Sequence, residues 1–277
     1  MNANTPGVIR VRVEPTNPGQ FFACCGLLEL ADRLWDGVEG RFTDGTFVLG
    51  QTAGSQTAGS ERTGVSLEVL FSAVITAALQ QVDPADPYSS PIHIPSPFGL
   101  RLDWWADSRS GGDRLKVWAG SMSNFRIASA MLAVLRDPDF LDEGLFDKAM
   151  VVFDVMETDK KREPFCFDAR RGVNSHPIDI GFSFDPLRMT SAAFPAVEFL
   201  CLVGLQRHRP APVPDRPRVF DYCTWTVGLD TRVAACATCG LLPNVGGNRY
   251  RFENAFRTDQ RKHKAFAPAT PLVRSTR

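Results

Sequence analysis

The chain has 277 residues, of which 31 are basic and 31 acidic, so its formal net charge at pH 7 is zero. This balance disfavours a histone-like nucleic-acid binder, whose signature is a high pI, although a neutral protein can still carry a local basic surface. Hydrophobic residues make up 44% of the chain and charged residues 22%, as in ordinary soluble domains. We expect one compact unit over residues 1–277, which can be subdivided into residues 1–120 and 121–277.

The sequence predicts a cytoplasmic protein with no membrane anchor. The longest apolar runs contain Glu29 and Glu198 and fall short of the roughly 20 uncharged residues that a membrane span needs. The first residues lack the charged segment and apolar segment of a secretory signal. The seven cysteines are odd in number and lack the spacing of a disulfide scaffold, which favours reduced thiols.

The first half of the chain predicts a β-α-β-β-α-β order, which is typical of ferredoxin-like folds such as RRM and RAMP domains. Alternating apolar and basic residues indicate the first strand, and Asn17-Pro18 fits a helix start. Asp44-Gly45 is a strong two-residue hairpin turn. The predicted elements are a strand at 8–13, a helix at 18–35, a hairpin at 41–49, a helix at 65–82, and strands at 98–105 and 114–118.

The remaining segments predict connectors and a mixed second half. Residues 50–60 repeat the motif QTAGS and are expected to form a mobile loop, and the proline-rich residues 83–97 an extended connector. Further predicted elements are a helix at 123–135, a strand at 178–184, a helix at 194–206, and strands at 219–227 and 249–255. The predicted fold class is therefore α+β, with a ferredoxin-like first half continued by a mixed α+β second half.

Motifs of common enzyme classes are missing from the sequence. It contains no Walker-type phosphate loop, dinucleotide fingerprint, HExxH motif or nucleophile elbow, and we expect no catalytic residue. His176 follows Arg170-Arg171, and a histidine among cations can transfer protons in RNA cleavage. A loop histidine beside a proline is, however, more often simply exposed.

Three cysteines raise the question of a metal site. Cys236 and Cys239 have a chelating spacing and Cys223 precedes them, but a closed structural zinc site needs four ligands. The fourth would have to be His208, His263 or Cys201. We favour the alternative that Cys236 and Cys239 line the buried face of a helix as small apolar side chains. We therefore expect neither a metal nor a cofactor.

Arginine-rich groups, some beside aromatic residues, are the strongest functional signal. On a strand at 114–118, Arg114, Lys116 and Trp118 would share one face, which suits backbone contact and base stacking, although tryptophans are more often buried in the core. The residues that we expect to bind nucleic acid are Arg109, Arg114, Lys116, Trp118, Arg126, Arg170, Arg171, Arg249, Tyr250, Arg251, Arg257, Arg261, Lys262 and Lys264. A further arginine-rich group comprises Arg207, Arg209, Arg216 and Arg218.

Four segments together resemble a CRISPR-associated family, the Csb-type subunit of subtype I-U (I-G) systems. This family is described both as the Cascade large-subunit equivalent and as a RAMP-like protein. The segments are NPGQFFACCGLLELADRLW (17–35), PFGLRLDWWADSRSGGDRLKVWAG (97–120), FDARRG (167–172) and FPAVEFLCLVGLQRHRP (194–210). The similarity extends over residues 8–264.

The resemblance implies a non-catalytic subunit of a type I CRISPR effector complex. Its partners would be other Cascade subunits, crRNA, target double-stranded DNA and the helicase-nuclease, and its tasks PAM reading and R-loop stabilisation. Two alternatives stay open. One is a RAMP-type endoribonuclease that processes precursor crRNA with His176 or His263, and the other is a purely structural subunit whose arginines bind sister subunits.

Overall fold

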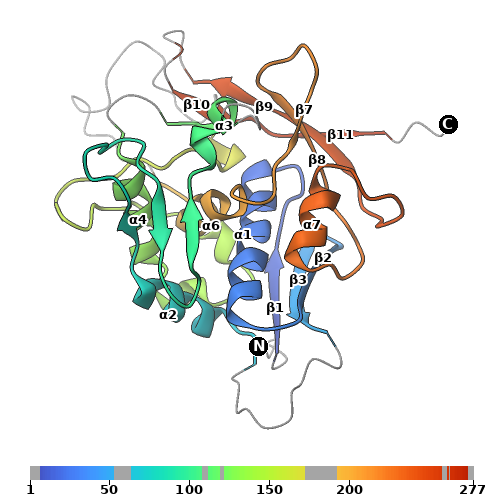
Figure 1. The fold of residues 1–277 in the computed structure, drawn as a ribbon, viewed down its shortest axis with the longest axis horizontal. Helices are drawn as coiled ribbons and strands as arrows, with labels where there is room; N and C mark the ends of the chain where they lie inside the picture. The colour runs from blue at the N-terminus through green and yellow to red at the C-terminus, as the bar shows by residue number, and fades with distance from the viewer. Residues whose placement is uncertain are drawn as a thin grey trace.

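The computed structural model describes residues 7–52, 64–107, 112–118, 122–171, 192–257, 261 and 263–273. In this part of the chain the fold is mixed α+β, with small antiparallel sheets packed around two central helices (Figure 1). The helices are α1 (Pro18–Leu34), α2 (Leu67–Ala77), α3 (Gly112–Leu115), α4 (Asn124–Val134), α6 (Pro195–Gly204) and α7 (Thr231–Thr238). The strands are β1 (Val8–Arg12), β2 (Val38–Thr43), β3 (Thr46–Gln51), β4 (Gln80–Gln81), β5 (Ile92–Ile94), β6 (Leu100–Leu102), β7 (Ala211–Pro212), β8 (Val219–Cys223), β9 (Arg249–Phe256), β10 (Lys264–Phe266) and β11 (Thr270–Leu272).

The first sheet has the order β1-β3-β2 and is antiparallel throughout. The predicted strand at 8–13, the helix at 18–35 and the hairpin at 41–49 are confirmed. Asn17 is the N-cap of α1, where its side chain accepts a hydrogen bond from the backbone N–H of Gln20. Asp44 and Gly45 have φ of 46° and 73°, the left-handed conformation that a tight hairpin turn requires.

The structure departs from the predicted order after α2. A ferredoxin-like unit needs the next strand to join the first sheet, but β4, β5 and β6 form a separate sheet with each other. The outer edge of β1 instead meets the loop before residue 145, where the Arg12 N–H donates to the carbonyl of Glu143 at 2.7 Å. The helix predicted at 65–82 ends at Ala77, since Ala78 has a left-handed φ of 54°. The ferredoxin-like order is therefore not confirmed.

The strands predicted at 98–105 and 114–118 are wrong in extent and in kind. β6 is shorter than predicted, and the next residues form a 3-10 turn, η1 (Trp104–Ala106). Residues 112–115 form α3, and residues 116–118 are irregular. Aromatic packing explains the change, because Trp104, Trp105 and Trp118 make edge-to-face contacts with one another in the core. An exposed strand face would have separated these rings.

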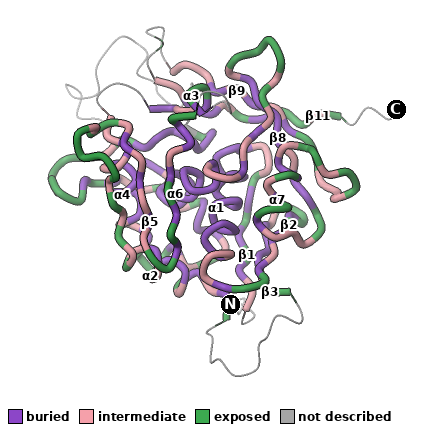
Figure 2. The backbone as a smooth tube through the Cα atoms, in the orientation of Figure 1, coloured by how far each residue is buried: buried purple, intermediate pink, exposed green. Residues whose placement is uncertain are grey.

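Helices α1 and α6 cross at the centre of the molecule and are buried along most of their length (Figure 2). The crossing is close because glycines face the opposite backbone. A Cβ atom on Gly26 would lie 2.0 Å from the carbonyl O of Leu200, and one on Gly204 would lie 2.0 Å from that of Phe22. The predicted helices at 194–206 and 123–135 are confirmed as α6 and α4. One hydrophobic cluster contains residues from both halves of the chain.

The second main sheet has the order β10-β9-β8-β7, and β11 pairs with β9. The strand predicted at 249–255 is confirmed as β9, and the strand at 219–227 ends earlier, at Cys223. Tyr222 of β8 stacks on Phe21 of α1 with ring centroids 4.4 Å apart, which joins this sheet to the central helices. Most of the predicted loop at 50–60 and all of the strand predicted at 178–184 lie outside the described residues. None of the described helices combines the length and apolar character that a membrane crossing would need.

Candidate nucleic-acid interface

Arg249 and Arg251 of β9 are held by a single carboxylate. Both guanidinium groups bind Asp221 of β8, with N–O distances of 2.6 and 2.7 Å. Burial alone would raise the pKa of Asp221, but hydrogen bonds from these two arginines lower it below its ordinary value. Between them, Tyr250 is only 6% exposed and stacks on Tyr222. Tyr250 therefore belongs to the packing of the sheet, whereas Arg249 is exposed and shares one carboxylate with Arg251.

Arg126 is likewise engaged in an internal ion pair. Its guanidinium binds the buried carboxylate of Asp154 at 2.8 Å and also contacts Glu157. Arg162 contacts the same Asp154, which in addition accepts the backbone N–H groups of Met156 and Glu157. Asp154 thus organises the turn at residues 154–157, and the charge of Arg126 is largely compensated.

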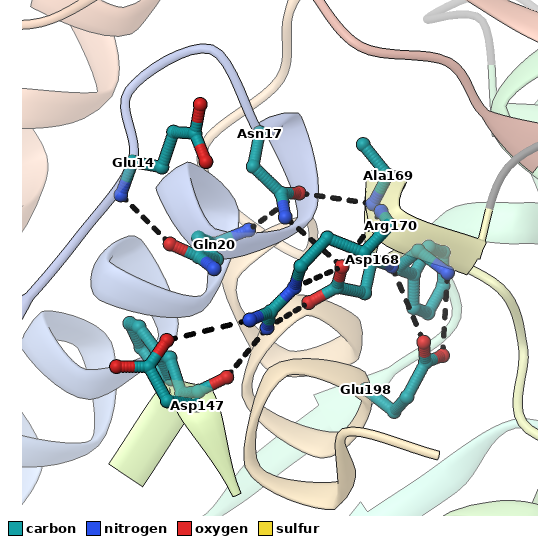
Figure 3. Close-up of polar contacts among 10 residues, drawn as sticks. Glu14, Asn17, Gln20, Asp147, Asp168, Ala169, Arg170 and Glu198 are labelled. Carbon is teal, nitrogen blue, oxygen red and sulfur yellow. Dashed lines mark hydrogen bonds and ion pairs between the residues drawn. The ribbon is translucent and has the colours of Figure 1, made fainter. Parts of the chain in front are cut away.

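Arg170 belongs to a buried polar network that fixes the segment at 166–170 (Figure 3). The carboxylate of Glu198 on α6 accepts the backbone N–H groups of residues 166, 167 and 168, at 3.0, 3.3 and 3.2 Å. Asn17 donates to Asp168 and accepts the N–H of Ala169, both at 3.0 Å. The guanidinium of Arg170 then binds Asp168 at 2.8 Å. The N-cap of α1 and an acidic residue of α6 therefore hold this arginine in place.

A polar depression of about 280 Å³ opens beside Arg170. Its charged lining consists of Arg12 and Arg170 together with Glu14, Asp44 and Asp147. Asp147 lies 3.3 Å from Arg170 and 3.6 Å from Arg12, so the cations here already face carboxylates. Such a balanced lining disfavours a polyanion.

A different part of the molecule brings together basic residues that are far apart in sequence. Two hydrogen bonds connect residues 114–117 with β9 and β10. The backbone N–H of Lys264 donates to the carbonyl of Val117 at 3.0 Å, and Asn254 Nδ2 donates to the carbonyl of Arg114 at 2.6 Å. As a result α3 lies against β9 and β10 (Figure 1). The basic residues brought together here, called the basic surface below, are Arg114, Lys116, Arg218 and Lys264. Arg257 directly follows β9, and Arg261 lies in the chain between β9 and β10. Arg114 and Lys116 thus meet Lys264 from the C-terminal part of the chain, and Arg218 of the further arginine-rich group joins them.

Like charges are crowded in the basic surface. Burial, together with the charges of Arg218 and Lys116, lowers the pKa of Lys264 to about 8. Burial also lowers the pKa of Lys116, although the charges of Asp113 and Asp86 oppose this effect. Lys264 Nζ has a backbone carbonyl, that of Asp113, as a hydrogen-bond acceptor at 3.2 Å. A bound phosphate would relieve this repulsion, because an opposite charge nearby favours the protonated amine.

Arg218 and Asn254 show how this surface is built. Arg218 binds Glu253 at 3.3 Å, and its guanidinium lies 4.4 Å from the centre of the Phe256 ring. Asn254 is fully buried, on the same side of β9 as Tyr250 and Phe252. Asn254 is not among the residues predicted from the sequence to form the site. The available signal was a polar residue at an inward position of the alternating pattern RYRFENAF, where an apolar side chain is expected.

The remaining predicted residues fall into two categories. Trp118 is only 2% exposed and packs against Trp104, Trp105 and Phe165, so its ring faces are not open to a base. Arg109, Lys262, His176 and the side chain of Arg171 lie outside the described residues.

Cys236 and Cys239 do not match the favoured interpretation of a buried helix face. The buried residues of α7 include Ala234 and Ala237, whereas Cys236 is exposed and Cys239 is half-buried. The helix is rotated so that its alanines pack inward, and the prediction that Cys236 is buried is wrong. Within the described ranges, no group of three or more His, Cys, Asp or Glu side chains has an arrangement that could hold a metal ion.

Comparison of the chain with models of known families, with curated proteins and with solved structures finds no match.

Proposed function

We propose that this protein is a non-catalytic subunit of a cytoplasmic type I-U (I-G) CRISPR effector complex, and that its basic surface binds a nucleic-acid backbone. Its partners would be the other Cascade subunits, the crRNA and target double-stranded DNA, with a contribution to PAM reading and R-loop stabilisation. The helicase-nuclease is a further proposed partner. No cofactor enters the proposal.

The observation that carries the proposal is the convergence of Arg114, Lys116, Arg218 and Lys264 on one surface. Arg218 is paired with Glu253, and arginines elsewhere on the chain, such as Arg126 and Arg249, likewise bind carboxylates. Arg114, by contrast, is exposed and forms no ion pair with any described residue. Exposed cations that are not paired internally are the groups that can exchange counterions for phosphates.

The resemblance supplies the biological setting of the proposal. The order β1-α1-β2-β3 with adjacent antiparallel strands is compatible with a RAMP-like origin, in which the last strand of the ferredoxin-like unit would have moved into another sheet. The proposal therefore keeps the RAMP-like assignment for this first part of the chain.

Salt-dependent binding tests the role of the basic surface. We would measure fluorescence anisotropy of labelled single-stranded RNA and DNA at several salt concentrations, with the wild type and the double variant Arg114→Ala/Lys264→Ala. The slope of log K against log salt is negative, and each lost phosphate contact reduces its magnitude by about 0.7 on a single strand. The slope of the double variant should therefore be smaller in magnitude by about 1.4. The matched control Arg10→Ala/Lys148→Ala removes the same charge outside the basic surface and should bind like the wild type. Equal slopes for the double variant and the control would refute the proposal.

Co-expression tests membership in the complex. The tagged chain would be produced with the subunits encoded beside it and with a CRISPR array, then analysed by size-exclusion chromatography and RNA extraction. Copurification with crRNA and the other subunits is expected. Cleavage of precursor crRNA by the isolated chain in the presence of a chelator would instead establish the endoribonuclease alternative, for which His263 beside Lys264 would be the candidate acid-base residue.

A further inference from the structure

An exposed tyrosine lies directly beside the basic surface. Tyr88 is 45% exposed and makes no ring contact with another described aromatic residue. Ser89, the next residue, accepts a hydrogen bond at its Oγ from Lys116 Nζ at 2.6 Å. Tyr88 therefore belongs to the loop whose next residue binds the Lys116 ammonium.

The backbone that carries Tyr88 is held at several points. Its carbonyl accepts hydrogen bonds from the indole of Trp118 at 3.3 Å and from the backbone N–H of Asn124 at 3.4 Å. Its N–H and that of Ser89 both donate to one carboxylate oxygen of Asp86, at 3.0 and 2.9 Å. An exposed apolar ring on so well anchored a loop loses little entropy when a ligand packs on it.

This arrangement also explains the burial of Trp118. The sequence suggested that its indole stacks on a base. In the structure the indole is buried and its N–H donates a hydrogen bond to the Tyr88 carbonyl. The Lys116 ammonium lies 5.1 Å from the centre of the buried Trp118 ring, and Tyr88 is the exposed aromatic residue of the loop that Lys116 contacts.

We propose that Tyr88 stacks on an unpaired base while Lys116 and its neighbours bind the adjoining phosphates, so that the basic surface prefers single-stranded nucleic acid. This inference rests on the proposed function and names the form of its ligand. Phosphate contacts alone do not distinguish a single strand from a duplex, whereas an aromatic ring needs a base whose face is free. Stacking of this kind tolerates every base, since each has a π-face.

The test compares oligonucleotides that differ only in their bases. Binding of the wild type, Tyr88→Ser and Tyr88→Phe would be measured by anisotropy on a 12-nucleotide oligo(dT), on the same backbone with abasic sites, and on a hairpin duplex. One stacked base contributes a factor of roughly 5 to 140 in Kd. We expect Tyr88→Ser to weaken oligo(dT) binding by that factor, to leave the abasic and duplex ligands unchanged, and to be rescued in Tyr88→Phe.

Phe153 provides a matched control, because it is also 45% exposed but lies outside the basic surface. Phe153→Ser should bind all three ligands like the wild type. If the wild type binds oligo(dT) and Tyr88→Ser binds it equally well, or loses affinity for all three ligands alike, the stacking inference is overturned while the proposed function stands. If the wild type binds none of them, the proposed function itself fails and the inference with it.

Discussion

Replacing Gly204 by alanine tests the helix crossing that holds the two halves of the chain together. A Cβ atom at this position would lie 2.0 Å from the carbonyl O of Phe22 and 2.7 Å from the backbone N of Gly26. Both obstructing atoms belong to the main chain, so no change of side-chain rotamer relieves the contact. Helices α1 and α6 would have to separate by about 1 Å, which weakens the dispersion contacts along the crossing.

The expected cost follows from two opposing effects. Overpacking of a core position costs about 1–3 kcal/mol, and a contact between two backbones belongs at the upper end of that range. Alanine regains about 1 kcal/mol through its higher helix propensity. The free energy of unfolding should therefore fall by roughly 2 kcal/mol, which lowers the melting temperature of a chain of this length by about 3–4 °C.

Thermal and urea unfolding followed by circular dichroism would measure the effect. Gly144→Ala is the matched control, since Gly144 has a φ of −94° and its added Cβ would meet the guanidinium of Arg12, a flexible side chain that can move away. The control should melt within about 1 °C of the wild type. A Gly204→Ala variant as stable as the control would show that the backbones do not approach as closely as described, and would refute the reasoning.

Three further variants test charged groups. Asp154→Ala should lower the free energy of unfolding in urea by about 3 kcal/mol, because it leaves Arg126 without its buried partner; an effect below about 1 kcal/mol would count against that pair. Burial alone would raise the pKa of Glu29, but hydrogen bonds from Arg207 help lower it from 4.5 to about 2. The ionised Glu29 therefore contributes fully to the stability of the fold above pH 4.5, and this contribution is lost as the pH falls toward 2. Glu29→Gln should accordingly lose less stability than the wild type between pH 5 and pH 3, and parallel pH curves would contradict this. Lys264 has a pKa of about 8, and a bound phosphate would raise this pKa. Nucleic-acid affinity should therefore fall as the pH rises above 8. Lys264→Met should remove this pH dependence in anisotropy titrations.

The sequence by itself determined the elements that depend on local interactions. Asn17 and Pro18 start α1 because the cap and the first helical position involve only neighbouring residues. Asp44-Gly45 closes the hairpin because two consecutive left-handed residues match the twist of the flanking strands. The apolar segment 194–206 forms a buried helix because few of its residues could face water.

Tertiary structure decided which of the many arginines remain available. Arg249 looks like Arg114 in the sequence, but its guanidinium binds Asp221 on the neighbouring strand. No local pattern encodes that pairing, because the partners are 28 residues apart and meet only through the β8–β9 register. The same holds for the contact of Lys264 with residues 113–117, which creates the basic surface.

The strand predicted at 114–118 failed for a related reason. Alternation of polar and apolar residues there suited a strand, but packing of Trp118 with Trp104 and Trp105 stabilises a compact turn instead. Burial of those indoles left Tyr88 as the exposed aromatic residue on the loop that Lys116 contacts, although nothing in the sequence around Tyr88 distinguishes it. Local propensities therefore placed the helices and hairpins, while long-range packing chose which side chains face the solvent.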